Sequence, residues 1–304
     1  MQYRRFQGAM LVLTAILGCL SAFSQSRALV FQTDFGGKDG AVSAMKGVAF
    51  TISPALQQFD LTHEIPPYNI WEAAYRLEQT LPYWPAGTVF VSVVDPGVGS
   101  SRKSVVALLK TGQLVVTPDN GTLTLLAEHP GIDSLREIDE RSNRRKGSAD
   151  SYTFHGRDVY AFTGARLASG QIRFSEVGPL LPNRPILLPY QQARSNGNQL
   201  SGALPVLDPQ YGNVWSNIPL SMLQEAGIRY GDTLQVEIFH QDRSVYKGNL
   251  PFVTSFAAVP EGSPLAYVNS LLQLSLGINQ RNFAETYHIQ SGHEWRITAI
   301  HKRH

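Results

Sequence analysis

Five polar clusters flanked by glycine or proline are the parts of the 304-residue sequence with side chains suited to chemistry. In chain order they are Thr33-Asp34-Phe35-Gly36, Asp95-Pro96-Gly97-Val98-Gly99, Pro118-Asp119-Asn120-Gly121, Thr153-Phe154-His155-Gly156-Arg157-Asp158 and Asp208-Pro209-Gln210-Tyr211-Gly212-Asn213-Val214-Trp215. Any one cluster alone is typical of a tight turn, because Asp, Asn, Gly and Pro are ordinary turn residues. Together they carry carboxylates and aromatic rings, which favours one shared small-molecule cleft between domains.

The segments that carry the first four clusters alternate between strand-like and helical patterns. Helices are expected at residues 41–52, 70–81 and 156–167, with Asn69 as a suitable N-cap for the second, and strands at residues 28–32, 87–94, 105–109 and 114–117. This alternation predicts a three-layer α/β domain with a mostly parallel sheet over residues 25–190. Ligands of such sheets bind outside the carboxyl ends of the strands, which is where the clusters fall.

A second, smaller domain is predicted over residues 197–304. The polar stretch 188–199 is expected to be the linker. Shorter strand signals follow it at residues 234–239, 244–247, 265–268 and 295–300. They predict a small antiparallel β-barrel or sandwich, and we favour the barrel.

The first 24 residues resemble a cleaved secretory signal peptide. Arg4 and Arg5 precede an apolar run at residues 8–20, and Ala22-Phe23-Ser24 suits cleavage after Ser24. That run is short for a membrane span, which needs about 20 residues. A lipoprotein modified at Cys19 is less favoured, because Ile16-Leu17-Gly18 is a poor lipobox. The expectation is an exported, periplasmic protein without a membrane span after cleavage.

The charge of the mature chain argues against one class of binding partner, and its cysteine content bears on the compartment in which it works. Residues 1–24 hold two of the 26 basic residues and none of the 24 acidic ones, so the mature chain has a formal charge of zero. This balance argues against nucleic-acid binding through a broad basic patch. The single cysteine, Cys19, lies in the same segment, and a cysteine-free mature chain suits an oxidising compartment.

The ordered set of motifs resembles the S-adenosylmethionine hydroxide adenosyltransferase family, relatives of the fluorinases and chlorinases. The resemblance rests on the five clusters, together with Met45-Lys46-Gly47, Asp60-Leu61-Thr62-His63-Glu64-Ile65-Pro66-Pro67 and Asn269-Ser270. It spans the mature chain and implies hydrolysis of S-adenosylmethionine to adenosine and methionine. It also implies a homotrimer with active sites between subunits, and no cofactor besides the substrate.

The resemblance implies a set of residues around the attacking water. The family's aspartate, arginine and histidine fall on Asn69, Arg76 and His155. Asn69 departs from the pattern, because an amide can orient water but cannot accept its proton. Each residue also has a structural interpretation, namely a helix cap for Asn69, an ion pair with Glu72 for Arg76 and a hydrogen-bonded structural group for His155.

The resemblance also implies the substrate contacts. Asp34 matches the carboxylate that holds the ribose hydroxyls, and Asn213 matches the amide that recognises adenine. Asp208 and Ser270 match residues that hold the methionine end, and Tyr211 and Trp215 are expected to pack on the adenosine. Leu271 replaces an arginine of the halogenases. Asp95, Val98 and Gly156 replace fluorinase site residues, the last a halide-contacting serine, which favours water over halide.

Two alternatives from other classes stay open at this point. A hydrolytic metal site would draw on His63, Glu64, His155 and Asp158, but no ligand spacing typical of a metal motif is present. A non-catalytic exported binding protein for adenosyl compounds would explain both the signal peptide and Asn69. Turnover distinguishes this alternative from an enzyme.

Overall fold

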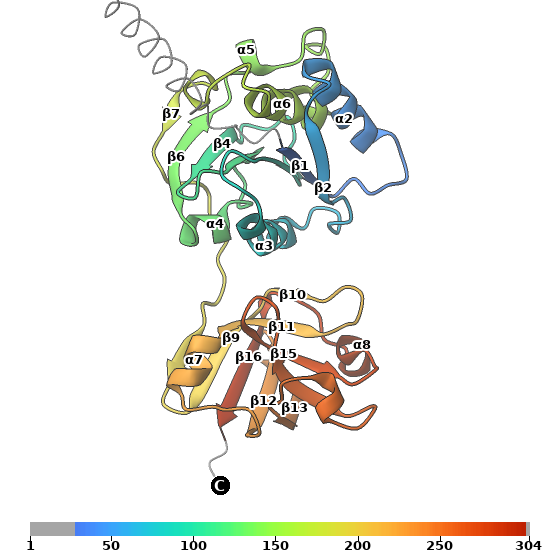
Figure 1. The fold of residues 1–304 in the computed structure, drawn as a ribbon, viewed down its shortest axis with the longest axis vertical. Coiled ribbons are helices and arrows are strands. Elements are labelled where there is room, and N and C mark those ends of the chain that lie inside the picture. The colour runs from blue at the N-terminus through green and yellow to red at the C-terminus, as the bar shows by residue number, and fades with distance from the viewer. Residues whose placement is uncertain (1–27, 302–304) are drawn as a thin grey trace, which may run out of the picture.

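A seven-stranded mixed sheet forms the first lobe of the computed structural model, which describes residues 28–301 (Figure 1). The predicted signal peptide lies outside the described residues. The strands are β1 (Ala28–Thr33), β2 (Gln57–Thr62), β3 (Val89–Val93), β4 (Ser104–Leu109), β5 (Leu114–Pro118), β6 (Ile132–Glu137) and β7 (Leu180–Leu181). Their order is β2-β1-β3-β5-β4-β6-β7. Only β4 and β7 run against the other strands, so the predicted mostly parallel sheet is confirmed.

Helices cover both faces of this sheet, and the four central strands β1, β3, β5 and β4 contribute side chains to both layers. One face carries α2 (Ala41–Ile52), the π-helical segment η2 (Gly156–Ala161) and α6 (Phe162–Ala168), and the other carries α3 (Ile70–Thr80) and α4 (Thr124–Glu128). Leu29 and Phe31 of β1 pack with the first group, whereas Val30 packs with the second. This alternation follows from the two-residue period of a strand. Shorter elements are η1 (Leu81–Tyr83), α5 (Glu140–Asn143) and η3 (Phe174–Glu176).

The second lobe consists of two antiparallel sheets. The five-stranded sheet has the order β13-β12-β16-β9-β8, and its strands are β8 (Arg194–Asn196), β9 (Gln199–Leu204), β12 (Thr233–His240), β13 (Arg243–Pro251) and β16 (Gly292–His301). The four-stranded sheet has the order β10-β11-β15-β14, and its strands are β10 (Val206–Leu207), β11 (Val214–Pro219), β14 (Pro264–Val268) and β15 (Gln273–Ile278). The antiparallel part of the prediction is confirmed. Closure into one barrel stays a prediction, because the strands pair into two separate sheets and not into one closed sheet. Strand β8 lies within the stretch expected to be the linker.

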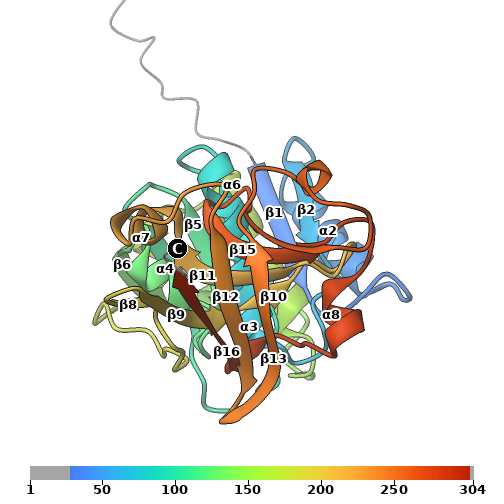
Figure 2. The same cartoon turned by 90° about the horizontal axis from the view of Figure 1, so that it is seen from below.

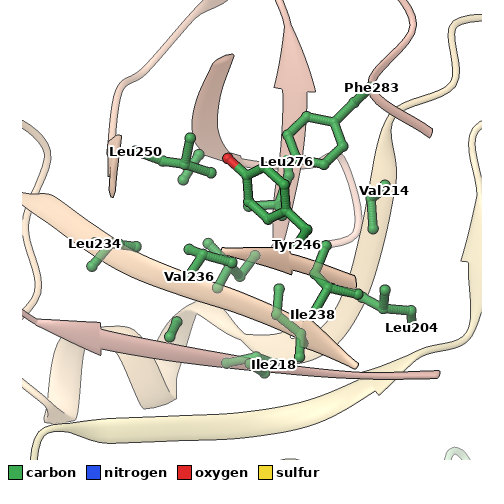
Figure 3. Close-up of a cluster of buried hydrophobic side chains, with 14 of the residues drawn as sticks. Leu204, Val214, Ile218, Leu234, Val236, Ile238, Tyr246, Leu250, Leu276 and Phe283 are labelled. Carbon is green, nitrogen blue, oxygen red and sulfur yellow. The ribbon is translucent and has the colours of Figure 1, made fainter. Parts of the chain in front are cut away.

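A continuous apolar core lies between these two sheets (Figure 3). Val236 and Ile238 of β12 meet Leu276 of β15, and Phe283 of the short helix α8 (Phe283–Tyr287) closes one side beside Tyr246. The remaining elements are α7 (Leu220–Glu225) and η4 (Phe256–Ala258). Figure 2 views the molecule from the side of this lobe, with β12, β13 and β16 in front of the α/β sheet.

Helix α3 joins the two lobes. The Trp71 indole Nε1 donates to the Pro205 carbonyl at 2.9 Å, and the Tyr75 hydroxyl donates to the Gln273 side-chain oxygen at 3.1 Å. Trp71 and Tyr75 are buried in a small apolar cluster with Val206 of the second lobe. The interface therefore buries both aromatic bodies while their polar ends keep partners.

Candidate active site

A cavity of about 260 Å³ opens where the chain leaves β1 and β3. These two strands are neighbours in the sheet, and the chain continues from β1 to β2 on one side and from β3 towards β5 on the other. Such a topological switch point is the usual ligand crevice of an open α/β sheet. Its lining residues are Asp34, Phe35, Pro67, Tyr68, Val93, Asp95, Val98, Thr153, Phe154, His155 and Gly156.

The turn that carries Asp34 is held by hydrogen bonds from both sides. The Asp34 Oδ2 atom accepts from the Tyr68 backbone N–H at 2.9 Å. The preceding Thr33 hydroxyl accepts from the Phe35 N–H at 3.2 Å and contacts His63 Nδ1 at 2.8 Å. The other His63 nitrogen lies 2.9 Å from Asp60. This chain of contacts holds the Asp34 carboxylate at the rim of the cavity.

His155 lies at the start of η2 and is 5 % exposed. Its Nε2 atom is 2.9 Å from Arg144 Nη2 and 3.8 Å from Glu140 Oε2. Within residues 28–301, its buried Nδ1 atom has no hydrogen-bond partner. Burial lowers the pKa of His155; Glu140 opposes this shift, and the guanidinium groups of Arg102 and Arg144 add to it. The ring is therefore neutral at neutral pH.

Asp95 forms a buried two-point ion pair beside His155. Arg102 donates to one Asp95 oxygen from Nε at 2.9 Å and to the other from Nη2. Arg102 also donates to the Ser104 hydroxyl at 2.9 Å. The Asp95 side chain is 5 % exposed, so this carboxylate is committed to Arg102 and contributes little net charge to the cavity.

Asn69 and Arg76 do not line this cavity. The Asn69 side chain caps α3, with its oxygen accepting from the Glu72 N–H at 3.0 Å. The Arg76 guanidinium donates to Glu72, to Gln79 and, at 3.2 Å, to the Leu207 carbonyl of the second lobe. Both structural interpretations from the sequence are therefore present, and their expected contacts with the attacking water stay predictions.

A larger cavity of about 560 Å³ lies in the second lobe and contains two predicted substrate residues. Tyr211 is 68 % exposed and Asn213 is buried, and both line this cavity together with Phe256 and Gln280. Asp208 shapes the loop beneath them. Its Oδ1 atom accepts from the Gln210 and Tyr211 N–H groups, and its Oδ2 atom accepts from the Asn213 amide at 3.2 Å.

Asp208, Trp215 and Ser270, the other predicted substrate residues, are not among the residues that line these two cavities. Trp215 packs at the interface between the lobes, against the cluster that contains Trp71. Ser270 is exposed in the turn between β14 and β15. Within one chain, the structure therefore brings Asp34 and His155 together and Tyr211 and Asn213 together, but the two cavities share no lining residue.

Several residues at these sites carried no signal in the sequence. Tyr68 and Phe256 line the cavities, yet neither is part of a polar cluster. Arg144 contacts His155 from eleven residues earlier, in a basic stretch typical of a solvated surface. Contacts across loops of this length depend on the path of the chain, which no local spacing encodes.

The four side chains that a hydrolytic metal site would use, His63, Glu64, His155 and Asp158, do not gather into one cluster. His63 is held between Thr33 and Asp60, and Asp158 accepts from Arg145 and Arg157. Across residues 28–301, no three His, Cys, Asp or Glu side chains gather closely enough to hold a metal ion. Likewise, no helix in that part of the chain is long and apolar enough to cross a membrane.

An open α/β sheet with a cavity at its switch point, followed by an antiparallel β domain with a second cavity, defines a two-domain small-molecule-binding protein. Residues 29–178 match the SAM hydroxide adenosyltransferase N-terminal domain, and residues 202–296 match the C-terminal domain. The chain belongs to the SAM hydroxide adenosyltransferase family.

Relatives and solved structures agree with this assignment. The chain is 34% identical to "(R)-S-adenosyl-L-methionine hydrolase" of Salinispora tropica, covering 88% of this chain and 97% of the relative. It is 29% identical to "Fluorinase" of Actinopolyspora mzabensis, covering 90% and 98%. A crystal structure of an uncharacterized conserved protein from Thermotoga maritima superposes with a TM-score of 0.82 at 30% identity, covering 90% and 99%.

Proposed function

We propose that this protein hydrolyses S-adenosylmethionine to adenosine and methionine. The observation that carries the proposal is the family match over both domains, combined with Asp34 and His155 in one cavity at the switch point of the sheet. The relatives described above are a hydrolase and a fluorinase by name. Asp34 offers carboxylate oxygens to two neighbouring ribose hydroxyls, a suitable match of acceptors to donors.

The reaction needs a well-placed oxygen nucleophile and no general acid. The oxygen attacks C5′ of the substrate, the C5′–S bond breaks, and its electron pair stays on sulfur as a neutral thioether. Catalysis then rests on placing the nucleophile in line with that bond, which the protein does by orientation and hydrogen bonding. His155 is the cavity residue suited to hold this oxygen.

The surroundings of Gly156 support water rather than halide as the nucleophile. A Cβ atom at this position would lie 3.2 Å from the Phe35 ring and 3.3 Å from the Phe154 ring. The serine that a halogenase would place here would therefore crowd both aromatic residues.

The complete site is proposed to form between copies of the chain, in a homotrimer. Support comes from the division of the predicted substrate residues between two cavities that share no lining residue. The exposed aromatic side chains of Tyr68 and Tyr211 at the edges of these cavities are suited to burial by a neighbouring copy. No cofactor besides the substrate is required.

Export to the periplasm is also part of the proposal. Its support is the charged, then apolar, then small-residue pattern of residues 4–24. Expression of the full chain in a Gram-negative host, followed by fractionation and N-terminal sequencing, tests it. A periplasmic protein starting at Gln25 is expected, and a full-length protein in the cytosol would contradict export.

Incubation of residues 25–304 with S-adenosylmethionine in ¹⁸O-labelled water tests the activity. Adenosine with ¹⁸O at its 5′ oxygen, detected by mass spectrometry, is the expected product. Tight adenosine binding without turnover would instead favour the non-catalytic binding protein. Absence of both binding and turnover would contradict both functions.

A further inference from the structure

Several contacts hold the Arg144 side chain in the position from which it contacts His155. Its side chain is 10 % exposed, its Nε atom donates to Glu140 at 3.0 Å, and its Nη1 atom donates to the Ser148 carbonyl at 3.3 Å. Its guanidinium also lies 4.7 Å from the centre of the Tyr152 ring. The Nη2 atom lies 2.8 Å from Glu140 Oε2 and 2.9 Å from His155 Nε2, so its two hydrogens can serve both partners.

This contact determines where the His155 proton lies. A guanidinium group can only donate hydrogen bonds, so His155 Nε2 must be the acceptor. A neutral imidazole that accepts at Nε2 carries its hydrogen on Nδ1. The buried Nδ1 atom has no partner within residues 28–301, while the ring lines the cavity beside Asp34. A buried N–H group without a partner is costly unless a ligand oxygen accepts from it.

We propose that Arg144 is a positioning residue that fixes His155 as the Nδ1–H tautomer, so that His155 donates a hydrogen bond to the attacking oxygen instead of removing its proton. The inference rests on the proposed hydrolysis and assigns a role to a residue outside the predicted site. In this arrangement the lone pair that a general base would need is already occupied by Arg144.

The step balances with hydroxide as the nucleophile. Water in the cavity loses a proton to solvent, and the resulting hydroxide accepts the Nδ1–H hydrogen bond of His155. Hydroxide then forms the C5′–O bond as the C5′–S bond breaks, and sulfur keeps the electron pair. No proton passes to His155 at any stage.

The tautomer is measured directly by long-range ¹H–¹⁵N NMR of the ¹⁵N-histidine-labelled wild-type protein, with His155→Gln used to assign the signal. An Nδ1–H, neutral ring is expected. A wild-type His155 ring with its hydrogen on Nε2 would overturn the proposal. This result needs no kinetic comparison with a variant, and it holds whether or not the protein hydrolyses S-adenosylmethionine. A missing turnover with the expected tautomer would instead count against the proposed function.

Kinetics of Arg144→Leu supply the second readout. The expected result is a fall in kcat of roughly 10²-fold with little change in KM, the scale seen when one donor to a developing oxyanion is lost. Arg144→Lys, which keeps a charged donor, is expected to recover part of the rate. Arg141→Gln is the matched control, because Arg141 lies on the same short helix α5, is 92 % exposed and, among residues 28–301, pairs only with Asp139.

Thermal unfolding of each variant separates positioning from loss of fold. Arg144→Leu is expected to fold, and its His155 signal is expected to shift away from the Nδ1–H form. A folded Arg144→Leu protein that keeps both the wild-type kcat and the Nδ1–H signal would overturn the role of Arg144.

Discussion

At the scale of single residues, Asp34 has one oxygen held by the protein and lies at the rim of the cavity. Its Oδ2 atom accepts from the Tyr68 N–H, and the side chain is only partly buried. Hydrogen bonds to a charged group contribute about 1.5–3 kcal/mol each. The Asp34 carboxylate is therefore the group in this cavity best suited to accept hydrogen bonds from the two ribose hydroxyls.

Asp34→Ala is expected to weaken adenosine binding by at least about tenfold, because one charged hydrogen bond of this strength is lost. Isothermal calorimetry with adenosine measures the change. Asp133→Asn serves as the control, because Asp133 is an exposed acidic residue of β6 that does not line the cavity. Unchanged affinity in the Asp34 variant would remove this residue from the nucleoside site.

The neutral His155 ring also makes stability depend on pH. Burial holds its folded-state pKa below the ordinary value of 6.5. As the pH falls through 6.5, the unfolded chain takes up a proton that the folded chain resists, so the folded state loses stability. The contribution of the ring is thus present above this pH and lost below it.

Urea unfolding of the wild type and of His155→Gln, at one pH well above 6.5 and one below it, tests this dependence. The wild type is expected to lose more unfolding free energy on acidification than the variant. Parallel losses in the two proteins would mean that His155 does not titrate as its burial implies.

At the scale of elements, the contact of α6 with the sheet depends on a glycine. A Cβ atom at Gly164 would lie 2.4 Å from Val91 Cγ2 of β3. That helix can approach β1 and β3 only because position 164 has no side chain. The approach in turn supports η2, the segment that begins directly after His155.

Gly164→Ala is expected to destabilise the protein by about 1–3 kcal/mol through overpacking, although alanine favours a helix. Gly47→Ala in α2 is the matched substitution, because no atom lies within 4 Å of the added Cβ. It is expected to stabilise by about 0.5–1 kcal/mol. Denaturant unfolding measures both, and equal effects would contradict the packing argument.

At the scale of the whole molecule, the division of the site between two lobes has a direct consequence. If each active site combines the first cavity of one copy with the second cavity of another, a defect in either cavity can be supplied by a different chain. This property does not exist for a site built within one chain.

Asp34→Ala and Asn213→Ala proteins are each expected to be nearly inactive, and mixing them after subunit exchange is expected to restore activity. Random mixing in a ring restores about one quarter of the sites, because a working site needs one intact cavity from each neighbour. Differently tagged chains verify that mixed assemblies form. Mixed assemblies without recovered activity would contradict a site shared between copies.

Local patterns were sufficient for the elements whose residues alternate or repeat in a simple way. The buried strands β1, β3 and β5 and the helices α2 and α3 lie close to their predicted bounds, because continuous apolar runs and helical spacing reflect burial on the sheet. Strand β2 was not predicted. It lies at the edge of the sheet beside β1 and none of its residues is buried, so no apolar pattern marks it.

The candidate site likewise has a part that the sequence predicted and a part that only the folded structure showed. Motif order along the chain predicted Asp34 and His155 as site residues, and both belong to glycine-containing clusters at the ends of predicted elements. Their meeting in one cavity, the Arg144 contact with His155 and the commitment of Asp95 to Arg102 came from the folded chain alone. The physical reason is distance along the chain: residue type and spacing report local geometry, whereas hydrogen bonds across long loops exist only after the sheet has brought their partners together.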